Sequence, residues 1–132
     1  MLATAREVSF ARLASENFLV REAGSGTRAA MEEVFASHSQ SITSSMEMSS
    51  NETIKQAVIA GLGLAFISAH TIGLELATGR LVTLAVQGLP LERQWYVIHL
   101  AAKRLSPIAA SFRDYLLENG KAVIDETINR RA

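Results

Sequence analysis

Apolar and polar residues between Ser49 and Ser68 follow first a helical and then a strand pattern. Apolar side chains recur at the i, i+3, i+4 and i+8 spacing of one helical face. Ser49, with Glu52 three residues later, predicts a capping box and a helix that begins there. The apolar run 64–67 then predicts a short strand that is buried on both faces. The side chains on the helical face are Ile54, Ala57, Val58 and Leu62.

Two glycines stand between this helix and this strand. Gly61 has no Cβ, so it is suited to the left-handed conformation that ends many helices. Gly63 allows the backbone to turn tightly into the strand. A helix that begins with hydroxyl and backbone N–H groups beside a parallel sheet is also a natural site for a small anion.

The same alternation of strand and helix precedes this stretch. Residues 18–22 are rich in large apolar side chains and predict a strand, which a glycine-rich segment ends. Ser25 predicts the N-cap of a following helix. Residues 42–48 predict another strand, and residues 8–13 predict a short surface turn of helix. The residues on one face of the helix after Ser25 are Thr27, Met31, Val34 and Phe35.

Two weaker patterns follow the buried strand. Residues 71–78 predict a short helix that ends at Gly79, and residues 81–86 predict a strand. Residues 88–90 predict a turn. The inward-facing residues of the short helix are Ile72 and Leu76, with Leu74 as a further candidate.

The C-terminal part predicts one long strand and one long helix. Residues 95–101 form an apolar strand pattern. Pro107 suits the first turn of the last helix, with Ser106 as its cap and Gly120 as a point of interruption. Strands that alternate with helices of this length predict an α/β fold with a parallel or mixed sheet flanked by helices. The predicted buried face of the last helix consists of Ile108, Phe112, Tyr115 and Leu116.

Composition narrows the class of protein. The 132 residues correspond to about one domain, and 48% of them are hydrophobic, which is enough for a core. The 13 basic and 13 acidic side chains balance, which argues against nucleic-acid binding by this chain. The absence of cysteine excludes disulfides and suits a reducing cytoplasm. The sequence shows neither a membrane-spanning run nor an apolar signal core, so a cytoplasmic location is expected.

The stretch from Ser49 to Ser68 resembles the second half of the effector-binding domain of LysR-type transcriptional regulators. Residues 18–28 resemble the strand and helix start at which such a domain enters its second lobe. Residues 93–100 and 103–108 resemble its return strand and final helix, and are similar to the subgroup that regulates Calvin-cycle (Rubisco) operons. The resemblance covers residues 8–120, which is almost the whole chain.

This resemblance implies a lobe of the type II periplasmic-binding-protein fold. Residues 1–17 would be a hinge remnant, 18–91 the second lobe, and 92–132 the return strand and C-terminal helix of the first lobe. Neither a winged helix-turn-helix nor the first half of the first lobe has a counterpart in these residues. The resemblance therefore implies a truncated fold that contacts DNA only through a domain absent from this chain. It also leads us to expect homodimers or higher oligomers, formed through the apolar segment 95–100.

The implied function is the sensing of a small anionic metabolite, without a cofactor. For this subgroup the expected ligands are phosphorylated sugars, phosphoenolpyruvate or a reduced nicotinamide nucleotide. Two other functions remain open, namely a solute-binding module unrelated to transcription and an assembly fragment without ligand affinity. Catalysis is not expected, because neither a nucleophile–base arrangement nor a metal-ligand spacing is recognisable. The three histidines are scattered along the chain.

Each candidate binding segment has two interpretations. Two segments, residues 24–28 and 49–51, lie at predicted helix starts. Their polar groups either donate hydrogen bonds to an anion or only cap the helices. Arg21 either binds an anionic effector or forms an ion pair with Glu22, Glu47 or another surface acid, and the ion pair is the favoured interpretation. The effector-binding residues that the resemblance implies are Arg21, Ser25, Gly26, Thr27, Ser49, Ser50, Asn51 and Phe66.

Overall fold

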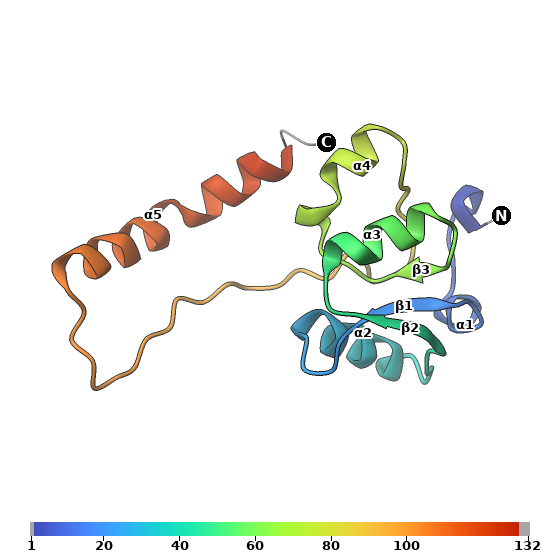
Figure 1. The fold of residues 1–132 in the computed structure, drawn as a ribbon, viewed down its shortest axis with the longest axis horizontal. Helices are drawn as coiled ribbons and strands as arrows, with labels where there is room; N and C mark the ends of the chain where they lie inside the picture. Colours follow the sequence, from blue (N-terminus) through green and yellow to red (C-terminus); the bar gives the residue numbers. More distant parts are fainter. Residues whose placement is uncertain (1, 130–132) are drawn as a thin grey trace. The chain divides into compact units, whose positions relative to one another are not determined.

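The computed structural model describes residues 2–129, apart from the side chains of residues 44, 45 and 127–129. The chain divides into two compact units, residues 1–90 and residues 91–132. The first unit contains the sheet, and the second contains a long helix (Figure 1).

The first unit is built on a parallel sheet of three strands in the order β2-β1-β3. These strands are β1 (Phe18–Arg21), β2 (Ser44–Met48) and β3 (Leu64–Ala65). Helix α2 (Gly26–Ser37) connects β1 to β2, and α3 (Asn51–Ile59) connects β2 to β3 (Figure 1). The predicted α/β architecture with a parallel sheet is confirmed.

The two connecting helices cover opposite faces of the sheet, because side chains of a strand alternate between its faces. Phe18 and Val20 of β1 belong to one core cluster with residues of α2. Leu19, between them, packs with Ile54 and Ala57 of α3. The central strand is therefore buried on both sides, as parallel strands usually are. The buried residues of α2 are Met31, Val34 and Phe35, as its spacing predicts.

The helix predicted from Ser49 begins one residue later than expected. Ser50 is the N-cap, and its side-chain oxygen accepts hydrogen bonds from the backbone N–H groups of Glu52 and Thr53. Leu62 lies beyond the helix and is 49% exposed, so its predicted place on the buried face is wrong. Gly61 adopts a φ of +78°, and this left-handed residue lies in the turn after the helix, as predicted.

Strand β3 is shorter and more accessible than the prediction of a doubly buried strand over residues 64–67. It comprises Leu64 and Ala65, both half-buried, at one edge of the sheet. An edge strand has a neighbour on one side only, which accounts for the difference. The turn lies at residues 60 and 61, before Gly63, which differs from the predicted position. Glycine is required at Gly63 by a close approach instead, because a Cβ there would lie 2.5 Å from the carbonyl oxygen of Asn17.

Two short helices precede the sheet, namely η1 (Leu2–Thr4) and α1 (Phe10–Ala14). Phe10 and Leu13 of α1 are buried in the core with α2. The predicted surface position of this segment is therefore wrong, because its apolar side chains fill space beside Phe35.

The segment after β3 contains η2 (Ala69–Thr71) and α4 (Gly73–Ala77). Leu74 is 68% exposed, so its candidate inward position is wrong. Glu75 is buried instead, and its carboxylate accepts a hydrogen bond from the Lys55 ammonium at 2.8 Å. The structure gives residues 81–86 no strand assignment, contrary to the prediction, although Val86 is buried in the core.

The second unit contains α5 (Pro107–Asn129), whose N-cap position is taken by Ser106 as predicted. Gly120 does not interrupt this helix. The predicted strand 95–101 is not formed, because a strand requires a backbone partner and the structure assigns none to this segment. The predicted buried face of α5 is also wrong, since Ile108, Phe112 and Tyr115 are exposed. Each helix within residues 2–129 is too short or too polar to span a membrane.

Candidate functional site

The carboxyl ends of β1 and β2 lie side by side and lead into α2 and α3. We call this side of the sheet its carboxyl edge, and it is distinct from the edge strand β3. Arg21, the last residue of β1, pairs in the parallel register with Met48, the last residue of β2. Helices α2 and α3 cover opposite faces of the sheet, so the chain continues from β1 toward one face and from β2 toward the other. Such a point, outside the carboxyl ends of parallel strands, is where α/β sheets usually bind ligands.

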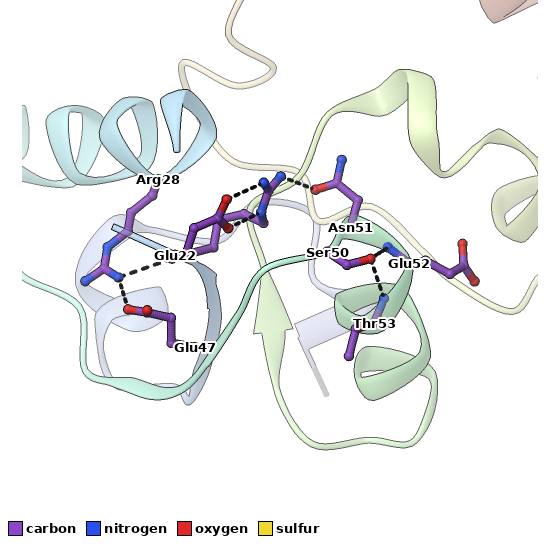
Figure 2. Close-up of polar contacts among 8 residues, drawn as sticks. Glu22, Arg28, Glu47, Ser50, Asn51, Glu52 and Thr53 are labelled. Carbon is purple, nitrogen blue, oxygen red and sulfur yellow. Dashed lines mark hydrogen bonds and ion pairs between the residues drawn. The ribbon is translucent and has the colours of Figure 1, made fainter. Parts of the chain in front are cut away.

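The start of α3 presents hydrogen-bonding groups at this edge. Ser50 caps the helix, with its Oγ 3.2 Å from the N of Glu52 and 3.5 Å from the N of Thr53 (Figure 2). Both of these contacts use the oxygen as acceptor, so the hydroxyl proton of Ser50 is still a donor. The positive end of the helix dipole also favours negative charge here. Ser49 precedes the cap and is exposed.

The N-cap residue of α2 resembles that of α3 in its backbone angles and differs from it in its side-chain hydrogen bonds. Ser25 lies at the N-cap position with extended backbone angles, but its side chain makes no capping hydrogen bond. Gly24 before it has a φ of +88°, a left-handed conformation that favours glycine. Gly26 and Thr27 form the first turn and are exposed or half-buried. The hydroxyl of Ser25 is therefore not committed to its own helix.

Arg21 lies between these two helix starts. Its Nε and Nη2 donate to the two carboxylate oxygens of Glu22 at 2.6 and 2.8 Å. Its Nη1 donates to Oδ1 of Asn51, the first residue of α3, at 2.8 Å (Figure 2). The ion pair that the sequence favours for Arg21 is confirmed with Glu22. The bond to Asn51 could not be read from the sequence, because the two residues are 30 positions apart.

A second arginine connects the same edge to α2. The Nη1 of Arg28 contacts Glu47 of β2 and donates to the backbone oxygen of Arg21 at 3.1 Å (Figure 2). Its Nε donates to Glu32 at 2.8 Å, an i, i+4 pair within the helix. The sequence places Arg28 within the candidate binding segment 24–28 at a helix start. The i, i+4 spacing to Glu32 is visible in the sequence, whereas the contacts to the sheet are not.

The charges at this edge largely compensate one another. Arg21 and Arg28 face the carboxylates of Glu22, Glu32 and Glu47. The hydrogen bonds from Arg21 lower the pKa of Glu22 below its ordinary value, so this carboxylate is ionised at neutral pH. An incoming anion therefore meets two cations that already have carboxylate partners.

Phe66 differs from the other predicted site residues. It follows β3, is half-buried, and packs against the core cluster that contains Phe18 and Phe35. These contacts give Phe66 a packing role, and its contact with an effector stays a prediction. Among the described residues, no three His, Cys, Asp or Glu side chains lie close enough together to hold a metal ion.

Residues 1–121 match the LysR substrate binding domain family. The chain belongs to this family. The match covers most of the chain, including the sheet, both helix starts and the beginning of α5. The resemblance inferred from residues 49–68 is therefore confirmed at the level of the family.

Relatives of this LysR-type chain include transcriptional regulators of RuBisCO operons. The RuBisCO operon transcriptional regulator of Allochromatium vinosum is 55% identical over 116 residues, which cover 88% of this chain and 38% of that protein. The HTH-type transcriptional regulator CfxR of Cupriavidus necator is 51% identical over 107 residues, which cover 81% and 34% respectively. The chain thus spans little more than a third of the length of these relatives.

A solved structure confirms the fold of the LysR-type domain. The regulatory domain of CcmR from Synechocystis PCC6803, in complex with 2-PG, is 40% identical with a TM-score of 0.81. The similarity covers 89% of this chain and 56% of the CcmR chain. The subgroup assignment to Rubisco-operon regulators agrees with these relatives.

Proposed function

We propose that this chain senses a small anionic metabolite at the carboxyl edge of its sheet, as part of a regulator of CO2-fixation genes. The observation that carries the proposal is the convergence of Arg21, the start of α2 and the start of α3 at one edge. The names of the relatives support the regulatory role, and the 2-PG complex of CcmR supports a small-molecule effector. DNA binding would belong to a helix-turn-helix in the complete regulator.

Each group at the edge has a defined part in anion binding. The hydroxyls of Ser25, Ser49 and Ser50 donate hydrogen bonds, and Gly26 and Thr27 bring the backbone of α2 close to the ligand. Each helix dipole contributes about 0.3–1 kcal/mol toward a bound negative charge. Arg21 adds a charge-assisted hydrogen bond, and Asn51 orients its guanidinium. The ligand classes are phosphorylated sugars, phosphoenolpyruvate, nicotinamide nucleotides and 2-PG.

The test is calorimetric titration of the 132-residue chain with 2-PG, comparing wild type with Ser50→Asp. Aspartate caps helices as well as serine does, so the stability of α3 is kept. Its carboxylate would repel the ligand, and we expect an affinity loss of at least about tenfold. Ser50→Val is a poorer probe, because loss of the cap alone costs about 1 kcal/mol of stability.

Ser9→Asp is the matched control. Ser9 is also an N-cap, since its side chain accepts a hydrogen bond from the N of Arg12. Ser9 lines a surface hollow together with His38, the residue at the C-terminal end of α2. That end of the helix lies about 18 Å from its start. Equal affinity losses in both variants, or a wild type that binds no 2-PG, would remove this edge as the sensing site.

A second function, self-association, is favoured by the second unit. Trp95, Tyr96, Ile98 and Leu100 are each 75% or more exposed. Apolar side chains gathered in one extended segment are typical of an interface. We therefore propose that the chain forms homodimers through residues 95–100. Light scattering at increasing protein concentration tests this, and a constant monomer mass for the wild type would contradict it.

A further inference from the structure

Glu22 occupies the binding groups of Arg21 in this structure. Its carboxylate takes one hydrogen bond from Nε and one from Nη2, the bidentate geometry in which arginine also binds phosphate and carboxylate ligands. The arginine side chain is 20% exposed and that of Glu22 is 38% exposed, so solvent reaches both partners. An anion that reaches Arg21 therefore meets a carboxylate already bound there.

We propose that Glu22 is a resident counter-ion that competes with the anionic effector for Arg21 and so sets the affinity of the site, an inference that rests on the proposed function. The bound effector takes over hydrogen bonds from Arg21 that Glu22 accepts in the unbound chain. A ligand with a doubly charged or bidentate anionic group displaces Glu22, and a singly charged ligand with one acceptor oxygen does so poorly. Glu22 thereby discriminates among anions of different charge.

The position of Arg21 does not depend on Glu22 alone. Its Nη1 is held by Oδ1 of Asn51 at 2.8 Å, from a different element of the fold. The guanidinium therefore keeps one anchor when Glu22 turns away. Glu22 follows the last residue of β1 in the loop to α2, and its side chain is 38% exposed. This geometry therefore assigns Glu22 the role of a competitor for Arg21, and not that of a residue that holds Arg21 in place.

Glu47 provides the matched comparison. It is an acidic side chain at the same sheet edge, 54% exposed, and its partner is Arg28 instead of Arg21. Arg28 in turn has two further acceptors, Glu32 and the backbone oxygen of Arg21. Glu22→Gln and Glu47→Gln change the net charge of the edge equally, while only Glu22→Gln removes the charge bound to Arg21.

The experiment is titration of wild type, Glu22→Gln and Glu47→Gln with 2-PG in the same buffer. We expect Glu22→Gln to bind about fivefold more tightly than wild type, the upper range for a partly exposed ion pair. The change for Glu47→Gln should stay below about twofold, since its carboxylate is paired with Arg28 and is exposed to screening by salt. Far-UV circular dichroism checks folding, and Glu22→Ala replaces Glu22→Gln if the latter is unfolded.

Four results would overturn the inference. With a wild type that binds, weaker binding by Glu22→Gln would mean that Glu22 supports Arg21, and unchanged binding would mean that Glu22 does not compete with the ligand. In both cases the proposed sensing site would stand. Equal tightening in both variants would mean a general charge effect. Absence of binding in all three proteins would overturn both the inference and the proposed function. Binding by Glu22→Gln alone would support both.

Discussion

Gly63→Ala is expected to destabilise the first unit, because a methyl group has no room at this position. A Cβ on Gly63 would lie 2.5 Å from the carbonyl oxygen of Asn17 and 3.3 Å from its carbonyl carbon. The same oxygen accepts a hydrogen bond from the N of Leu64 at 2.9 Å, which holds the start of β3 against the chain before β1. The methyl group and this hydrogen bond therefore compete for one carbonyl group.

The magnitude follows from the displacement that the clash requires. Ordinary contact with a Cβ begins near 3.4 Å, so the carbonyl oxygen has to move by roughly 0.9 Å. Such a movement stretches the bond to Leu64 beyond hydrogen-bonding range, at a cost of about 1 kcal/mol. Displacement of packed backbone adds about 1–3 kcal/mol. The free energy of unfolding should fall by about 2–4 kcal/mol.

Urea unfolding followed by far-UV circular dichroism measures this change, with Gly61→Ala as the control. Gly61 has a φ of +78°, and a Cβ added there would meet nothing within 4 Å, so alanine suffers only left-handed strain. That strain costs about 1–2 kcal/mol. If Gly63→Ala lost no more stability than Gly61→Ala, the close approach to Asn17 would not exist in solution.

Two further predictions concern the core and the ion pair between α3 and α4. Phe35→Ala should lower the free energy of unfolding by about 3–5 kcal/mol, measured by urea, because Phe35 is 2% exposed and contacts Phe10 and Phe18 edge-to-face. The hydrogen bond from Lys55 lowers the pKa of Glu75, so its stabilising effect is present above the ordinary glutamate pKa and is lost as the pH falls through the lowered value. Glu75→Gln should therefore have a lower urea midpoint than wild type at about pH 7, and the gap should narrow as the pH falls below the ordinary glutamate pKa; a constant gap would contradict this.

Local patterns were sufficient for the centre of the first unit. The apolar spacing of Met31, Val34 and Phe35 predicts α2, and that of Ile54 and Ala57 predicts α3. Both patterns repeat with the period of the helix, so they depend only on neighbours in the sequence. The family resemblance, which covers most of the chain, is also confirmed.

Long-range contacts account for the errors. Glu75 is buried in place of Leu74 because Lys55, 20 residues away, provides a partner for its carboxylate. Residues 81–86 resemble a strand locally but make no ladder with the sheet. The apolar segment 95–101 is likewise not a strand, because apolar alternation does not supply the backbone partner that a strand requires.

The candidate site also has features that follow from the local sequence and features that depend on long-range contacts. The sequence by itself determined that hydroxyls and glycines stand at two helix starts, and that Arg21 has an acidic neighbour in Glu22. Only the tertiary structure decided that both helix starts open at one sheet edge and that Asn51 binds Arg21. The physical reason is that residue types and local periodicity are properties of neighbouring positions, whereas the pairing of β1 with β2 brings together side chains 30 positions apart.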